Sequence, residues 1–409
     1  MQESIVARQP ILNSDQNVIA FEIIFKRTYD TKIEEEKISI SAEDINNDVE
    51  FIEQKNLSNG KKIFINFTGE LLKSEIADLL STDNLGIEIS KNIIADDEIT
   101  QTIENLKKDG ALIILNDISP EIIDSSVLNY SDIIKIDFNK YDNEQHKILI
   151  DNIKQNYNNI KFLADNINEH KQFEHARNCG YDYFQGIFFT KPDVVANREM
   201  PGYKLNYLNF LKELNKEDLD FDHLEKIIKN DISMSVSLLR TINAAYYGYS
   251  VSSIKQAATL LGINGLRKWS LIYLAEGLRD DKPDILFVNT LTRAEFAESV
   301  AEDFDIEENS GELFTMGMFS MMDAFLNRPI EDILDEISLN RKIKEALTKK
   351  RGIFGEILEL VIAFERSKWE EISVIEKYYK LDSKKLYNKY LKAVDFAYET
   401  MNLLMEHSE

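Results

Sequence analysis

Cysteine is nearly absent: the 409-residue sequence contains one, Cys179. No disulfide can form within the chain, and such cysteine usage is typical of a reducing cytoplasm, where we expect the protein to reside. The sequence also lacks an apolar run of about 18 residues, so we expect no transmembrane helix and no membrane partner. The opening residues MQESIVARQPILNSDQ carry polar and charged side chains throughout, so we expect no secretory signal there.

Positive charge is also in short supply. Lysine and arginine together number 48 against 72 aspartate and glutamate residues, which gives a formal net charge of −24. Nucleic-acid binding needs clustered basic side chains that replace the counterions of the phosphates, so we expect no nucleic-acid partner. The acidity is expected to keep the protein soluble instead.

Glycine and proline are scarce, with 15 and 6 residues. Two of the 6 prolines lie in one segment, TKPDVVANREMPGY (190–203), which also contains a Pro-Gly pair. A chain of this length is expected to form about two domains, because single cores rarely exceed roughly 250–300 residues. We therefore place a domain boundary in this segment, with one domain at 1–195 and the other at 196–409.

The first domain alternates short apolar runs with amphipathic segments. Strands are expected at 4–11, 17–27, 61–67, 85–90, 110–117, 132–138, 160–167 and 182–189. Helices are expected between them at 41–56, 70–80, 97–108, 120–128, 142–157 and 168–178. This alternation predicts a mostly parallel sheet, and so many strands in roughly 190 residues indicate an α/β fold of the TIM-like (β/α) barrel type. No helix separates the first two strands, so we expect them to pair antiparallel.

The second domain changes to an apolar period near 3.6, which is typical of amphipathic helices. Helices are expected at 222–231, 233–248, 253–262, 263–278, 284–304, 313–326, 330–337, 341–347, 353–366, 368–379 and 383–405. The sequence therefore predicts an all-α domain after the barrel.

Polar residues lie at or near the ends of the successive strands. They are Gln9, Glu22, Asn66, Glu88, Asn116, Asp117, Lys135, Asp137, Asp165 and Gln185. A single acid at a strand end is more often a cap or a surface residue than a ligand. The strand ends of a barrel converge at one mouth, however, so a polar group on each of them predicts a site there. Oxygen ligands of this kind suit Mg²⁺ or Mn²⁺ rather than zinc.

The same segments resemble, in order, the motifs of the EAL domain, the family of cyclic-di-GMP phosphodiesterases. They are RQPI (8–11), FEIIFK (21–26), INFT (65–68), IEIS (87–90), ILNDIS (114–119), IKID (134–137), LADNIN (163–168) and FQGIFFTKP (184–192). In that family, acids at the strand ends hold two divalent cations, which activate a water for attack on a phosphodiester. The resemblance implies that Glu22, Asn66, Glu88 and Asp117 match metal ligands.

Several positions depart from the family pattern. Asn116 replaces an aspartate, and Lys91 stands where the family has a glutamate. Asp165 and Asn168 each replace a glutamate, the former being the general base implied by the resemblance. Lys26 replaces an arginine that meets the nucleotide phosphate in the family. These changes remove negative charge and add positive charge, so we expect one weakly held Mg²⁺ or Mn²⁺, or none, in place of a two-metal centre.

The helical domain resembles an HDOD domain, a relative of the HD and HD-GYP phosphohydrolases. The resemblance rests on NDISMSVSLLRTINAAYYG (230–248) and SIKQAATLLGINGLRKW (253–269). HD enzymes need clustered His and Asp ligands, but this domain contains only His223 and His407, and Asp323 follows Met322 instead of a histidine. The residue inventory therefore predicts no metal-dependent hydrolysis by this half.

Together these features predict a catalytically inactive signalling protein, a degenerate EAL-like barrel followed by an HDOD domain. The protein is expected to act by nucleotide sensing, by partner binding or by both. Lys26, Lys91 and Lys135 could attract an anionic ligand such as cyclic-di-GMP to the mouth, and the HDOD half is expected to bind an unidentified signalling protein. A homodimer is compatible with the resemblance, because EAL domains often dimerise. Two alternatives stay open: a weak cyclic-di-GMP phosphodiesterase, and a pure interaction scaffold with no nucleotide ligand.

Overall fold

The structure is a computed structural model of the chain. It describes residues 5–26, 58–73, 84–90, 97–116, 118, 126–193, 213, 221–230, 232–245, 251, 253–279, 282–337 and 339–405. The chain divides into two compact units, one formed by Met1–Phe189 with Phe364–Trp369 and the other by Thr190–Ala363 with Glu370–Glu409. The boundary expected between residues 195 and 196 lies outside the described residues and stays a prediction.

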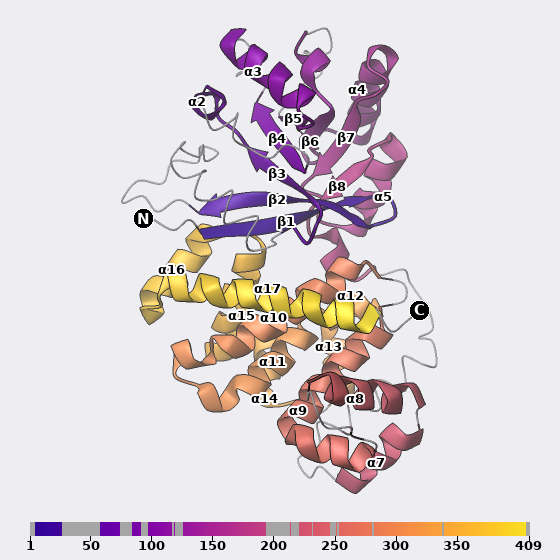
Figure 1. The fold of residues 1–409 in the computed structure, drawn as a ribbon, viewed down its shortest axis with the longest axis vertical. Coiled ribbons are helices and arrows are strands. Elements are labelled where there is room, and N and C mark those ends of the chain that lie inside the picture. Colours follow the sequence, from indigo (N-terminus) through magenta and orange to yellow (C-terminus); the bar gives the residue numbers. More distant parts are fainter. Residues whose placement is uncertain are drawn as a thin grey trace. The chain divides into compact units, whose positions relative to one another are not determined.

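The first unit contains a closed barrel of strands in chain order, from β1 to β8 (Figure 1). The strands are β1 (Ile5–Asn13), β2 (Val18–Lys26), β3 (Lys62–Asn66), β4 (Leu85–Ser90), β5 (Leu112–Asn116), β6 (Ile133–Asp137), β7 (Lys161–Asp165) and β8 (Tyr183–Gln185). β1 runs antiparallel to both β2 and β8, and every other neighbouring pair is parallel. The predicted barrel and its antiparallel first pair are confirmed.

Helices connect the parallel strands on the outside of the barrel. They are α2 (Gly69–Leu72), α3 (Asp97–Lys108), α4 (Asn143–Asn156) and α5 (His170–Cys179), with the 3₁₀ turns η4 (Ser126–Tyr130) and η5 (Phe188–Thr190). α4 begins at a capping box, in which Asp142 accepts from Gln145 N and the Gln145 side chain accepts from Asp142 N. The helix expected at 41–56 lies outside the described residues.

The barrel interior is filled by apolar side chains below the strand ends. The core includes Ile11, Ala20, Phe64, Ile114, Ile133 and Leu163. Gly86 of β4 leaves room for the Phe64 side chain in the barrel interior, because a Cβ added at residue 86 would lie 2.4 Å from Phe64 Cδ1. The interior is therefore closed beneath the mouth, and the polar residues form a layer above an apolar floor.

The second unit is helical throughout the residues described. It contains α7 (Phe221–Asn230), α8 (Ile232–Ala245), α9 (Ile254–Gly277), α10 (Asp284–Ser299), α11 (Ser310–Phe319), α12 (Met322–Leu326), α13 (Ile330–Glu336), α14 (Arg341–Lys349), α15 (Gly352–Glu365), α16 (Trp369–Tyr379) and α17 (Ser383–Met405), with the 3₁₀ turns η6 (Ala301–Phe304) and η7 (Glu307–Asn309). The predicted all-α character is confirmed. The helices expected at 253–262 and 263–278 form α9, which breaks at Gly262, where φ is 64°. Among the described helices, none is both long and apolar enough to cross a membrane.

α10 is the centre of the helical unit, since it packs against both α11 and α17. Leu286, Phe287 and Leu291 are fully buried along it. α11 approaches α10 closely at Gly317, where an added Cβ would lie 2.4 Å from Ala294 Cα. The side chain of any other residue would therefore push the two helix backbones apart.

We expect Gly317→Ala to destabilise the protein by about 1–3 kcal/mol, the usual cost of overpacking a core. Gly311→Ala is the matched control in the same helix, because no atom lies within 4 Å of the Cβ that it would add. Urea unfolding followed by far-UV circular dichroism measures both variants. Equal midpoints for the two variants would contradict the close α10–α11 contact.

Candidate functional site at the barrel mouth

The strand register brings the polar strand-end residues into neighbouring positions. Gln9 of β1 lies opposite Glu22 of β2. Asn66 pairs with Glu88 between β3 and β4, Asn116 with Lys135 between β5 and β6, and Asp137 with Asp165 between β6 and β7. Because the carboxyl ends of parallel strands share one rim, the side chains of alternate residues converge at the mouth.

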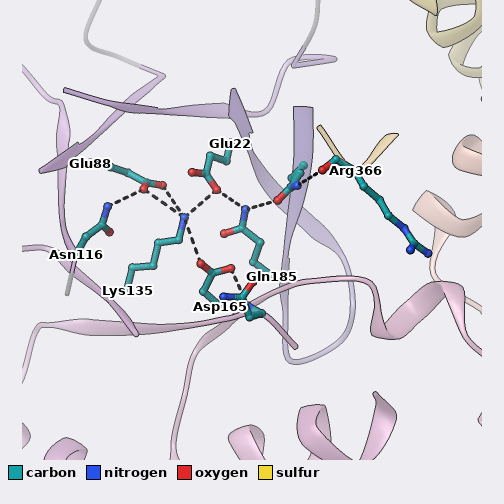
Figure 2. Close-up of polar contacts among 9 residues, drawn as sticks. Glu22, Glu88, Asn116, Lys135, Asp165, Gln185 and Arg366 are labelled. Carbon is teal, nitrogen blue, oxygen red and sulfur yellow. Dashed lines mark hydrogen bonds and ion pairs between the residues drawn. The ribbon is translucent and has the colours of Figure 1, made fainter. Parts of the chain in front are cut away.

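Lys135 is the central residue of this mouth, as Figure 2 shows. Its ammonium lies 2.8 Å from Glu22 Oε2, 3.2 Å from Glu88 Oε2 and 3.9 Å from Asp165 Oδ2. The lysine side chain is only 9% exposed, so water screens these pairs weakly. Burial disfavours the ammonium, but Glu22, Glu88 and Asp165 outweigh it and raise the pKa of Lys135.

Glu88 is fully buried, and both oxygens of its carboxyl group accept hydrogen bonds from neighbouring side chains. Asn116 Nδ2 donates to Glu88 Oε2 at 3.1 Å, and Lys135 Nζ contacts both carboxylate oxygens. Burial, reinforced by the charge of Glu22, raises the pKa of Glu88 to about 7 despite the nearby ammonium. The neutral Asn116 therefore acts as a hydrogen-bond donor to the carboxyl group of Glu88.

Two glutamines close the opposite side of the mouth. Gln185 Nε2 donates to Glu22 Oε2 and, at 3.3 Å, to Gln9 Oε1. The other atom of this amide, Gln185 Oε1, is buried without a hydrogen-bond partner, and so is Asn116 Oδ1. Buried amide oxygens normally accept a hydrogen bond or coordinate an ion, so these two atoms have unused capacity at the mouth.

The two aspartates at the mouth differ in their contacts. Asp165 faces Lys135, and its Oδ1 accepts from Asn166 N at 2.7 Å. Burial raises the pKa of Asp165. Asp137 is half-buried and accepts from Asn139 N at 2.9 Å, which shapes the turn after β6. Asp165 is therefore part of the Lys135 cluster, while Asp137 supports the adjoining turn.

For the other residues predicted at the site, the structure gives the position or a main-chain contact, or does not describe the side chain. Asn66 is half-buried beside Glu88. The backbone N–H of Asn168 donates to Gln172 Oε1 at 2.8 Å, at the start of α5. Lys26 ends β2, but its side chain lies outside the described residues, as do Lys91 and Asp117. Their predicted roles therefore stay predictions.

The oxygen-rich mouth has the chemistry of a hard-cation site. Three carboxylates surround one ammonium, which leaves negative charge that protons or a cation would relieve. Carboxylate and amide oxygens suit Mg²⁺ or Mn²⁺. Within the described ranges, no group of three or more His, Cys, Asp or Glu residues is arranged to hold a metal ion. The residues thus fit a divalent ion in type, but the ammonium of Lys135 lies between them.

The sequence did not reveal a buried arginine in the helical unit. Arg293 of α10 is 4% exposed, and its NH1 donates to the main-chain oxygen and the hydroxyl of Ser320. The only sequence signal was a charged residue in the apolar run of α10. Asp323 is half-buried and accepts from Ala324 N, and burial raises its pKa. The side chains of His223 and His407 lie outside the described residues.

We expect Glu88→Gln to change the pH dependence of stability. Burial raises the pKa of Glu88 in the folded protein to about 7, whereas the pKa of a glutamate in the unfolded chain is about 4.5. Glu88 therefore contributes stability below pH 4.5 that is lost as pH rises through 7. Between pH 5 and 8 the variant should gain on the order of 2 kcal/mol relative to the original protein.

Chemical denaturation of both proteins at pH 5 and pH 8 measures this difference. Glu144→Gln is a control, since Glu144 lies in the exposed first turn of α4. A stability difference between the Glu88→Gln variant and the original protein that is constant with pH would contradict the raised pKa of Glu88.

Comparison with known proteins gives relatives that span nearly the whole chain. An uncharacterized protein of Bacillus subtilis, YuxH, is 28% identical over 411 aligned residues, covering 97% of this chain and 98% of the relative. The cyclic di-GMP phosphodiesterase CdgJ of Vibrio cholerae is 26% identical over 385 residues, covering 91% of this chain and 87% of the relative.

Solved structures also resemble part of the chain. Klebsiella pneumoniae BlrP1, in a complex with manganese and cyclic-di-GMP, is 18% identical with a TM-score of 0.36; the match covers 45% of this chain and 55% of BlrP1. An EAL domain protein from Listeria monocytogenes is 20% identical with a TM-score of 0.34, covering 46% of this chain and 87% of that protein. The model of the HDOD domain family matches residues 200–355, so the helical half of the chain carries an HDOD domain.

Proposed function

We propose that this protein is a cytoplasmic signalling protein that senses cyclic-di-GMP at its barrel mouth without hydrolysing it. The observation that carries the proposal is the amide of Asn116, which donates to Glu88 at the mouth instead of supplying a further carboxylate. The relative in Vibrio cholerae, named a cyclic di-GMP phosphodiesterase, supports this choice of ligand. The HDOD half would bind a signalling protein and pass on the state of the barrel.

The lack of hydrolysis follows from the charges at the mouth. Two-metal hydrolysis needs several carboxylates that clamp two divalent ions and activate a water. Here Asn116 supplies an amide where an aspartate would add a negative charge, and it donates to Glu88. Lys135 uses both carboxylate oxygens of Glu88 as well. These contacts leave at most one weak site for Mg²⁺ or Mn²⁺, which Glu22 and Asp165 would hold and which would supply positive charge for an anionic ligand.

Incubation of the purified protein with cyclic-di-GMP and Mn²⁺ tests the absence of catalysis. We expect no linear product above the buffer background, and the same result for Glu22→Ala. The retained Glu22, Asn66, Glu88 and Lys135 favour the second candidate, a weak phosphodiesterase. Linear product formed by the original protein and abolished by Glu22→Ala would establish that alternative and overturn our proposal.

Calorimetry with cyclic-di-GMP in a buffer free of divalent cations tests whether the mouth binds the nucleotide. We expect a saturable isotherm that is lost in a Gln9→Ala/Lys135→Ala double variant, because both residues contact the carboxylate and amide groups of the mouth. Lys161→Ala is the control, since this exposed lysine pairs with Asp182 at the start of β7. No isotherm with the original protein would favour a pure scaffold without a nucleotide ligand.

A further inference from the structure

A histidine is buried against the outer side of the barrel, among groups that the site at the mouth does not use. His146 lies in α4, which packs against α5, and its side chain is 0% exposed. Its ring contacts two connections that are far apart in the sequence, at Phe138 after β6 and at Tyr181 between α5 and β8. We propose that His146 is a pH-sensitive latch, which holds these two connections together while its ring is neutral and allows the face between α4 and α5 to open locally once the ring is protonated.

Both ring nitrogens of His146 have hydrogen-bond partners, and these partners fix the position of its proton. Nε2 lies 3.1 Å from the main-chain oxygen of Phe138. Because a carbonyl oxygen only accepts, Nε2 must carry the proton. Nδ1 lies 2.7 Å from the hydroxyl oxygen of Tyr181, so the neutral ring accepts a hydrogen bond from that hydroxyl. The neutral tautomer therefore satisfies both of its nitrogens.

Aromatic rings enclose the histidine. The imidazole stacks on Phe138, with ring centroids 4.4 Å apart and an angle of 6° between the planes. Tyr141 and Tyr181 make edge contacts with it, at centroid distances of 5.7 Å and 5.6 Å. Phe138 is 6% exposed and Tyr181 is 4% exposed. A positive charge on this ring would therefore be removed from water, which disfavours the imidazolium.

The acids near His146 only partly offset this cost. Asp142 and Asp137 favour the imidazolium, but burial outweighs them and lowers the pKa of His146 from its usual value of 6.5. The two carboxylates already accept from the main-chain N–H groups of Gln145 and Asn139. Both acids are therefore committed to shaping the turn and the helix start beside the ring.

The titratable groups on the α5 side stay neutral over the relevant range. They are Tyr181 and Cys179, and burial raises the pKa of both. The hydroxyl of Tyr141, on the α4 side, donates to the main-chain oxygen of Ile118. The group whose charge changes as the pH falls through 6 is therefore the imidazole itself.

Protonation removes the acceptor that the Tyr181 hydroxyl uses. Nδ1 then carries a proton and can only donate, so the phenolic proton must find another acceptor. Tyr181 is buried, and water reaches its hydroxyl only when α4 and α5 separate. Because folding lowers the pKa of His146, the histidine contributes stability that is fully present above pH 6.5 and is lost as the pH falls through the lower pKa of the folded protein.

Hydrogen exchange of the full chain between pH 8 and pH 5, followed by mass spectrometry and expressed as protection factors, tests the latch. We expect protection of peptides that cover α4 and Tyr181 to fall below pH 6.5, by up to about tenfold per pH unit for the uptake of one proton on opening. His146→Gln should abolish this fall, because a neutral amide accepts from Tyr181 and donates to the Phe138 oxygen at every pH. His175→Gln is the control, since His175 is an exposed histidine of α5, and this variant should keep the fall.

No fall in the original protein, or an equal fall in a folded His146→Gln variant, would overturn the inference. If that variant does not fold, nuclear magnetic resonance of the original protein labelled with nitrogen-15 histidine decides the question. The His146 signals, assigned through contacts with the ring protons of Phe138 and Tyr181, should show the proton on Nε2 at pH 8 and a titration midpoint below 6.5. A proton on Nδ1, or a midpoint at or above 6.5, would overturn it equally. These measurements need no nucleotide or metal ion, so their outcome is independent of the proposed function.

Discussion

The pairing of the Lys135 ammonium with Glu22, Glu88 and Asp165 is the interaction on which the functional account depends. These charges are held above an apolar floor that includes Phe64 and Ile114, where water cannot screen them effectively. Removing one partner from such a cluster would leave its neighbours buried and uncompensated. The same pairing gives the mouth a permanent internal cation, which is the physical reason to expect weak binding of an external one.

The closed barrel makes this cluster possible because its register aligns residues that are far apart in sequence. Glu22 lies on β2 and Asp165 on β7, far apart in the sequence. The carboxylates of both nevertheless lie within 4 Å of the Lys135 ammonium. The helices and apolar core set the strand positions, and the strand ends then set the chemistry. In the helical unit, the buried α10 and its close approach to α11 at Gly317 provide a comparably fixed scaffold for the HDOD domain.

The strands and helices could be predicted from the sequence because the spacing of their apolar residues is regular. The apolar run before Asn116 became β5, and α3 and α17 occupy the predicted ranges. The sequence also placed Glu22, Glu88, Lys135 and Asp165 at the strand ends of one barrel. The sequence could not show that the ammonium of Lys135 pairs with Glu22, Glu88 and Asp165. The direction of this side chain depends on its burial and on contacts between strands that are distant in the sequence. The orphan oxygens of Asn116 and Gln185 were invisible for the same reason.

An anomalous diffraction map from crystals grown with millimolar Mn²⁺ tests the central claim most directly, because it locates the metal ions and Lys135 in the same molecule. The account predicts at most one manganese peak at the mouth. Two manganese ions on the carboxylates of Glu22, Glu88 and Asp165 would contradict it.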